Sequence, residues 1–184
     1  DLQVHTTPEV WKRGITLKAG EHNNIALDAP QGKIRFKMNG SNYYGRLPAI
    51  VKDDKSCNVI NEQLEGSEHR YLVDQYNVEI LTTPRIRLKN VTVEQDQVNT
   101  ITIPAPGKLY VSKSQDRVGS IYQQQGSQLK WVCDIAEKVR RERLILQPGK
   151  YKLITRPSSA FETRKTSEQE FEIHSGGSTQ INVK

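Results

Sequence analysis

The chain of 184 residues carries 27 basic and 21 acidic side chains, a net charge of +6, and a hydrophobic fraction of 35%. Its mean hydropathy of −0.68 and the lack of any run near the roughly 18 apolar residues of a membrane helix argue against membrane insertion. The basic residues are interspersed with acidic ones. The densest cluster, KVRRER at 138–143, has no interleaved aromatic residues, so we expect no nucleic-acid site.

Near-copies of one short motif punctuate the chain. They are DLQVHTTP at its start, YNVEILTTP at 76–84 and KYKLITRP at 150–157. Their prolines, Pro8, Pro84 and Pro157, lie 76 and 73 residues apart. Threonine favours strands, whereas proline cannot donate to a ladder and ends them. We therefore interpret the motif as structural punctuation that occurs once per repeat.

The segments between these motifs also repeat. GITLKAGEHNNIALDAPQGKI at 14–34 aligns with NVTVEQDQVNTITIPAPGKL at 90–109, and TSEQEFEIHSGGSTQINVK at 166–184 resembles both. Upstream of the returning motif, RYLVDQYNVEILTTP aligns with RLILQPGKYKLITRP. Self-similarity at a fixed period indicates a repeat architecture. We expect two full copies of about 75 residues and a partial third.

Inside each copy the apolar residues recur with a period of two, as in Ile34, Phe36 and Met38. Such alternation, broken by Gly and Pro turn signals, predicts about seven short strands per copy. The predicted fold class is all-β: tandem antiparallel β-sandwich repeats. The run SGGS at 175–178 is expected to be a hairpin turn, and DIAEKVRRERL at 134–144 a short helix or a charged loop.

The predicted domains are 1–75 for the first sandwich and 76–184 for the second, with the partial third copy, 158–184, packed on it. The phase stays open, because the strand before each proline could close one sandwich or open the next. The 27 residues of the partial copy bury too little surface to fold alone. The partial copy must therefore pack on the second copy, exchange strands with it, or await a partner.

Three segments carry a family resemblance: LQPGKYKLITRP, YNVEILTTP and HTTPEVWKRGITLKAGEHNNIALDAPQGKI. They resemble the region that follows a von Willebrand factor A domain in secreted proteins of some Gram-negative bacteria. The resemblance implies prealbumin-like or carboxypeptidase-regulatory-like sandwiches and a periplasmic or cell-surface address. The metal-binding D-x-S-x-S motif of the A domain does not occur in this sequence. Because a strand pattern begins at Asp1, we expect that a leader or a domain has been removed upstream.

No pattern in the sequence predicts catalysis, a metal site or a cofactor. The four histidines, His5, His22, His69 and His174, each lie alone, without the partner that a nucleophile or base needs. The aspartates of KDDKS at 52–56 lie between lysines, which is unfavourable for calcium. We therefore expect a chain that is not an enzyme.

The two cysteines, Cys57 and Cys133, lie far apart in the sequence. Burial as small apolar residues is expected for both. A bridge between them stays open, and it would require a compartment outside the cytosol.

The most suggestive surface feature is NGSNYYG at 39–45. Adjacent tyrosines in an extended segment point in opposite directions, so at least one is expected to reach solvent. An aromatic face beside amides suits a carbohydrate. The opposing interpretation is that one tyrosine plugs the sandwich and the other lies at its rim. The candidate contact residues are Asn39, Asn42, Tyr43, Tyr44 and Trp11.

The two tryptophans are expected to differ in exposure. Trp11 follows the first proline turn, so we expect it to be exposed. Trp131 alternates with Leu129 and Cys133, so we expect it in the core.

Taken together, these features predict a non-enzymatic, extracytoplasmic stalk or interaction region of a larger protein. It would hold a neighbouring domain at a fixed distance. The expected partner is another protein or a neighbouring domain of the same polypeptide. The alternative function is a carbohydrate- or peptide-binding module that uses the 39–45 loop.

Overall fold

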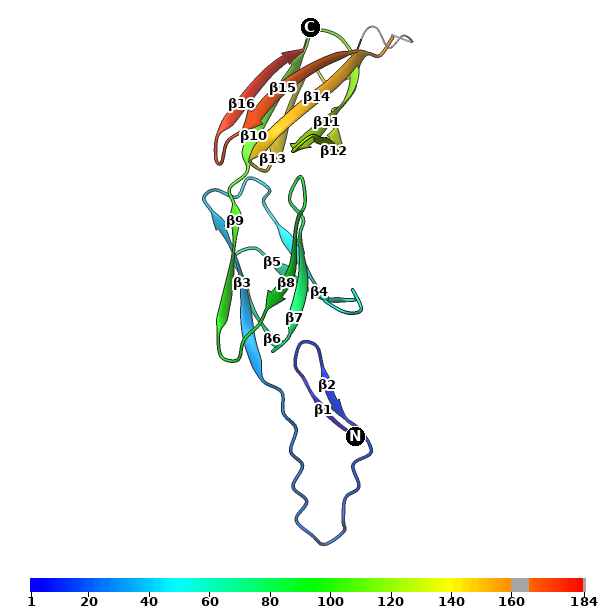
Figure 1. Cartoon of the computed structure of the whole chain (residues 1–184), viewed down its shortest axis with the longest axis vertical. Coiled ribbons are helices and arrows are strands. Elements are labelled where there is room, and N and C mark those ends of the chain that lie inside the picture. The colour runs from blue at the N-terminus through cyan, green and yellow to red at the C-terminus, as the bar shows by residue number, and fades with distance from the viewer. Residues whose placement is uncertain (160–165, 184) are drawn as a thin grey trace. The chain divides into compact units, whose positions relative to one another are not determined.

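In the computed structural model, residues 1–159 and 166–183 are described, and their secondary structure consists of strands without a helix (Figure 1). The predicted all-β class of sandwich repeats is confirmed. A short hairpin of β1 (Leu2–Val4) and β2 (Val10–Lys12) precedes fourteen further strands. By their contacts the residues form two units. The first unit consists of residues 1–37, 46–80 and 87–102, and the second unit of residues 38–45, 81–86 and 103–184.

The first sandwich has seven strands in two sheets, with the orders β6-β3-β9 and β5-β4-β7-β8. Alternate residues of these strands point inward, as the burial of Ile34, Phe36 and Met38 in β3 shows. The strands are β3 (Gln31–Asn39), β4 (Pro48–Asp53), β5 (Val59–Leu64), β6 (Glu68–Leu72), β7 (Gln75–Ile80), β8 (Ile86–Thr92) and β9 (Val98–Pro104).

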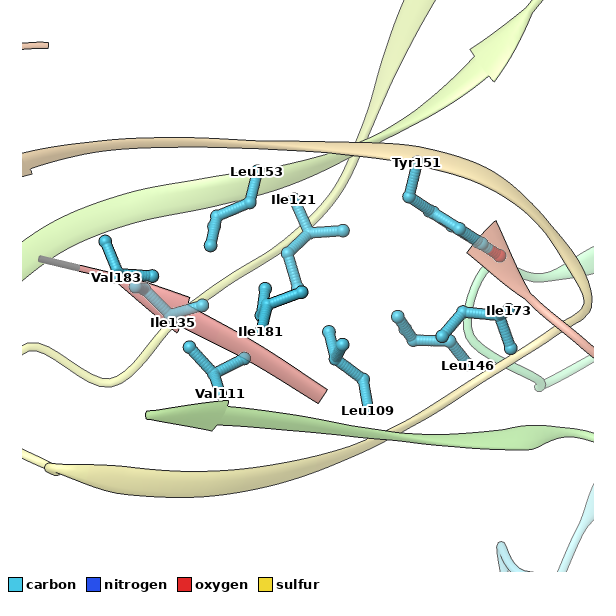
Figure 2. Close-up of a cluster of buried hydrophobic side chains, with 10 residues drawn as sticks. All are labelled: Leu109, Val111, Ile121, Ile135, Leu146, Tyr151, Leu153, Ile173, Ile181 and Val183. Atoms are coloured by element: carbon cyan, nitrogen blue, oxygen red, sulfur yellow. The ribbon is translucent and has the colours of Figure 1, made fainter. Parts of the chain in front are cut away.

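The second sandwich repeats this topology, with sheet orders β13-β10-β16 and β12-β11-β14-β15. Its strands are β10 (Gly107–Lys113), β11 (Arg117–Gln125), β12 (Gln128–Asp134), β13 (Arg141–Leu146), β14 (Gly149–Pro157), β15 (Ser167–Ile173) and β16 (Ser178–Val183). Figure 2 shows side chains of both sheets pointing toward one another in its core. The buried cluster consists of Leu109, Val111, Ile121, Ile135, Leu146, Tyr151, Leu153, Ile173, Ile181 and Val183.

The pairing of strands sets the phase of the repeat. A boundary between residues 75 and 76 would separate β7 from β4, its neighbour in the first sandwich. The expected partial third copy, 158–184, is the closing part of the second sandwich as far as it is described, because β15 pairs with β14 and β16 with β10. Its residues 160–165 and 184 lie outside the described residues.

A buried tyrosine marks the same corner of each sandwich. The hydroxyl of Tyr76 donates to the carbonyl of Leu72 at 2.8 Å, and that of Tyr151 to the carbonyl of Gln147 at 2.7 Å. Each bond spans four residues, as in the tyrosine corner of immunoglobulin-like sandwiches. Burial raises the pKa of both phenols.

The Thr-Thr-Pro motif also has a repeated geometry. In both copies the first threonine hydroxyl donates to the carbonyl of the proline, from Thr6 at 2.6 Å and from Thr82 at 2.7 Å. The carbonyl of the next threonine accepts from the backbone of the tyrosine corner. Thr7 accepts from Leu72 within the first unit, and Thr83 from Gln147 within the second. The motif therefore fixes a turn against the tyrosine corner.

Three expectations about single segments are wrong, and a fourth had two alternatives. SGGS at 175–178 is not a hairpin turn, because β15 and β16 lie in different sheets. Of the helix or charged loop expected at 134–144, the structure has the loop, followed by β13, in which Leu144 and Leu146 alternate toward the core. Trp131 is 57% exposed, since the register shifts between Ile121 and Tyr122 and turns it outward. Cys57 is exposed in the turn after β4, whereas Cys133 is half-buried, and both are free thiols.

Candidate functional site

The loop of residues 39–45 lies between β3 and β4 and belongs to the second unit by its contacts. Asn42 organises it. The Oδ1 atom of Asn42 accepts from the amide of Tyr44 at 2.9 Å, and its Nδ2 atom donates to the carbonyl of Gly45 at 2.8 Å. Side-chain bonds of this kind fix turns locally, so the Asn42 amide is engaged by its own loop.

The Tyr44 hydroxyl is the centre of a polar network in the second unit. It accepts from the Nε2 atom of Gln147 at 3.2 Å and from the amide of Thr83 at 3.2 Å, and it lies 3.4 Å from the carbonyl of Thr83. Burial raises the pKa of Tyr44 above its ordinary value. The half-buried phenol thus ties the 39–45 loop to the Thr-Thr-Pro turn and to the tyrosine corner.

Tyr43 is engaged through its ring. The Lys108 ammonium lies 3.8 Å from the ring centroid, within the range of a cation–π contact. The candidate residues Asn42, Tyr43 and Tyr44 therefore lie together, and the contacts described serve the fold. Asn39, also exposed, ends β3, whereas Trp11 lies in β2 of the first unit and is 47% exposed, as expected. Binding of a carbohydrate or peptide by this loop stays a prediction.

A larger hollow, of about 940 Å³, lies on the outer face of the sheet β13-β10-β16. We call it the arginine face. In one row across the three strands, Tyr110 lies opposite Arg143 on one side and Gln180 on the other. In the next row, Ser112 lies between Arg141 and Asn182. Tyr110 is 40% exposed, and both arginines are exposed.

The acidic groups near the arginine face are engaged elsewhere. The Glu142 carboxylate accepts from the amide of Ala136 at 2.9 Å, and Asp116 pairs with Arg140 at 3.3 Å. Within residues 1–159 and 166–183, neither Arg141 nor Arg143 forms an ion pair. Two guanidinium groups therefore flank an exposed tyrosine without a neutralising carboxylate.

The first sandwich carries an ion pair at the matching position. There Arg35 in β3 lies opposite Glu68 in β6, and the two form a salt bridge. Lys33 reaches the same carboxylate at 2.6 Å. Hydrogen bonds from Lys33 and Arg35 lower the pKa of Glu68. At the same positions the second sandwich has Tyr110 and Arg143, so the carboxylate that pairs with arginine in the first sandwich has no counterpart there.

Sequence reasoning missed this face because Tyr110 and Arg143 are distant in the sequence and meet only through strand pairing. The densest basic cluster in the sequence, KVRRER at 138–143, does not form one surface patch in the structure. Arg140 pairs with Asp116, Glu142 turns inward, and Arg141 and Arg143 share one face. Aligning the two copies strand by strand offers the missing signal.

The other titratable candidates serve turns and edges. The Asp53 carboxylate of KDDKS accepts from the amides of Lys55 and Ser56 and from the Ser56 hydroxyl, and these bonds lower its pKa. All four histidines are exposed. Across the described ranges, no three His, Cys, Asp or Glu side chains lie close enough to hold a metal ion. In the same ranges no helix is long and apolar enough to cross a membrane.

Comparison with known proteins adds similarities in structure. No family model matches the chain. No curated protein matches it either. Among solved structures, it is similar to the TIE protein of Bacillus anthracis, with 14% identity over 85% of this chain and 33% of that one, at a TM-score of 0.35. It is also similar to a streptococcal ancillary pilin, with 12% identity over 86% of this chain and 64% of the pilin, at a TM-score of 0.31. The chain thus spans about a third and under two thirds of these proteins.

Proposed function

We propose that this chain is a non-enzymatic, extracytoplasmic module that bears tension as the stalk or interaction region of a larger protein. That protein would be of the von Willebrand factor A type whose sandwich region the sequence resembles. The observation that carries the proposal is the pairing, within one sheet, of the first and last strands of a sandwich.

In the second sandwich the first strand, β10, and the last strand, β16, are parallel neighbours (Figure 1). Their register runs from Lys108 opposite Ser178 to Lys113 opposite Val183. The amide of Lys108 donates to Gly177 at 2.9 Å at one end, and that of Ser114 donates to Val183 at 3.2 Å at the other.

This pairing decides how the sandwich meets a pulling force. Tension along the chain reaches β10 at its beginning and β16 at its end, which are opposite ends of a parallel pair. The ladder bonds are then loaded together in shear, and they must fail as a group. If the same strands were pulled apart from one end, the bonds would break one at a time. Each bond contributes only about 0.5–1.5 kcal/mol, so resistance depends on loading them jointly.

The first and last strands of the first sandwich are arranged in the same way. Its first and last strands, β3 and β9, are also neighbours in one sheet. The amide of Lys33 donates to the carbonyl of Gln97 at 2.8 Å, which matches the bond from Lys108 to Gly177. The amide of Asp96 donates to Gln31 at 2.9 Å, as that of Gly176 does to Pro106 at 3.2 Å. A stalk function accounts for this repetition without requiring a catalytic site.

Single-molecule stretching of the full chain in two geometries tests the proposal. One geometry applies force between the N- and C-terminal ends. The other applies it between a handle at Ser114→Cys and the C-terminal end, in a background where Cys57→Ser and Cys133→Ala remove the native thiols. Ser114 is exposed and lies beside Val183, so the second geometry peels the pair from one end.

We expect the second sandwich to unfold at a force about twofold or more higher between the chain ends than from Ser114, because forced unfolding follows the unfolding rate of the loaded bonds. Equal forces in the two geometries would contradict the load-bearing role.

A further inference from the structure

We infer that the arginine face binds an anionic polysaccharide whose sugars carry carboxylates. The face is formed by Tyr110, Ser112, Arg141, Arg143, Gln180 and Asn182 on the outer side of β13-β10-β16. This binding activity goes beyond the load-bearing role and does not depend on it.

The charge of the face selects an anionic ligand. Arg141 and Arg143 are two residues apart on one strand and point to the same side, so their backbone positions are about 7 Å apart. Each guanidinium can hold a carboxylate by two parallel hydrogen bonds. Lys108, at the edge of the same face, adds a third positive charge that is turned toward Tyr43. Extended chains with regularly spaced carboxylates complement such a row.

The neutral residues of the face select a sugar as the bearer of that charge. The Tyr110 ring offers an apolar surface to the C–H groups of a pyranose. The amides of Gln180 and Asn182 lie on the other side of β10 from the arginines, and amides both donate to and accept from hydroxyl groups. A ring, two cations and two amides in a shallow hollow of about 940 Å³ match a carboxylated saccharide.

Nucleic acid fits the face less well than a saccharide. A platform for single-stranded nucleic acid stacks successive bases on several aromatic rings, whereas this face presents Tyr110 alone among its lining residues. Tyrosine and arginine also anchor protein interfaces, so an acidic protein is the competing ligand, and polyglutamate is the probe that distinguishes it from a saccharide.

The two copies of the repeat provide an internal contrast. In the first sandwich the position of Tyr110 holds Arg35, and the position of Arg143 holds Glu68, which closes an ion pair within the protein. The fold therefore does not require an unneutralised arginine at this position. Transplanting the pair, with Tyr110→Arg and Arg143→Glu together, should remove the site and keep the sandwich.

Calorimetric titration of the full chain with polygalacturonate tests the proposal, with neutral dextran, single-stranded DNA and polyglutamate as comparison probes. We expect saturable binding of polygalacturonate that weakens with salt. Arg141→Gln with Arg143→Gln should weaken it at least about tenfold, because two charge-assisted contacts are lost. The transplanted pair should have a similar effect.

The matched control is Arg13→Gln with Arg70→Gln, which removes the same charge from exposed arginines of the first unit. It should change the affinity by less than about twofold. Three results would each overturn the inference: no saturable binding of polygalacturonate by the parent protein, an equal loss in the control, or tighter binding of DNA or polyglutamate. None of them would alter the expected unfolding forces, so the two proposals fail separately.

Discussion

Replacing Gly107 by alanine should destabilise the second sandwich selectively, because the segment that follows β15 packs too close to Gly107 to leave room for a side chain. A Cβ atom on Gly107 would lie 2.6 Å from Cγ2 of Ile173 and 2.7 Å from the carbonyl oxygen of His174. Both neighbours belong to the segment that leads from β15 to β16. The matching Gly32 of the first sandwich is closer still, with its Cβ 2.0 Å from the carbonyl oxygen of Glu94.

The size of the effect follows from the bonds that hold this segment. Relieving both contacts to an ordinary 3.4 Å requires a shift of about 0.8 Å. The bonds from Lys108 to Gly177 at 2.9 Å and from Gly176 to Pro106 at 3.2 Å would then stretch beyond hydrogen-bond length. Losing two bonds costs about 1–3 kcal/mol, and the lower entropy of the unfolded chain returns about 0.4–1 kcal/mol. The expected net loss is about 1.3 kcal/mol.

Urea unfolding followed by tryptophan fluorescence measures this loss, since each unit contains one tryptophan. In a Trp11→Phe background, Trp131 reports the second sandwich, and Gly107→Ala should lower its urea midpoint by about 0.5–1 M. Gly177→Ala is the matched control in the same segment, because its Cβ would meet nothing closer than 3.3 Å. Equal urea midpoints for Gly107→Ala and Gly177→Ala, or for Gly107→Ala and the parent protein, would refute this reasoning.

Three further predictions concern individual side chains. Burial raises the pKa of Tyr151 in the folded state, so the contribution of this phenol to the unfolding free energy should be constant below about pH 10. Above that pH the unfolding free energy should fall by about 1.4 kcal/mol per pH unit for each such tyrosine. Tyr151→Phe should flatten the fall in urea titrations, and an unchanged slope would refute this. Burial also raises the pKa of Cys133 to about 11, so this thiol is about 0.1% thiolate at pH 8. When the protein is treated with maleimide, mass spectrometry should find Cys57 labelled first. Equal labelling rates for the two cysteines would contradict the structure. Tyr44→Phe should destabilise the second sandwich by about 1–2 kcal/mol, because it removes the hydrogen-bond partner of the part-buried Thr83 amide and Gln147 side chain. A loss of ligand binding at full stability would instead favour a binding role for the 39–45 loop.

Local patterns in the sequence predict the strands and the repeat well. Alternation in Ile34, Phe36 and Met38 is a property of one strand, and the Thr-Thr-Pro turns carry their structure in adjacent residues. Both are confirmed in the structure. The need for glycine at the aligned positions Gly32 and Gly107 could not be predicted from the sequence, because the atoms that exclude a side chain there come from distant segments.

Features that depend on pairing between distant strands could not be predicted from the sequence. The phase of the repeat is decided by β16, which joins β10 although some 65 residues separate them. The exposure of Trp131 comes from the register shift opposite β11, which breaks the alternation with Cys133. The arginine face requires Tyr110 and Arg143 to lie opposite each other across two strands.

The load-bearing role can be tested on single backbone bonds of the β10–β16 pair. In a parallel ladder that begins with Lys108 donating to Gly177, the amide of Thr179 points to β10 and that of Gln180 points away from it. Because β16 is an edge strand, proline at an outward-facing amide is tolerated. Thr179→Val serves as control for the bond from the Thr179 hydroxyl to the carbonyl of Glu172.

The most direct measurement compares the unfolding force of Thr179→Pro and Gln180→Pro when the full chain is stretched between its ends. We expect Thr179→Pro to lower the force of the second sandwich clearly, since it deletes one bond loaded in shear. Gln180→Pro and Thr179→Val should leave that force near the parent value. Equal forces for the two proline variants would contradict the claim that the β10–β16 pair bears the load.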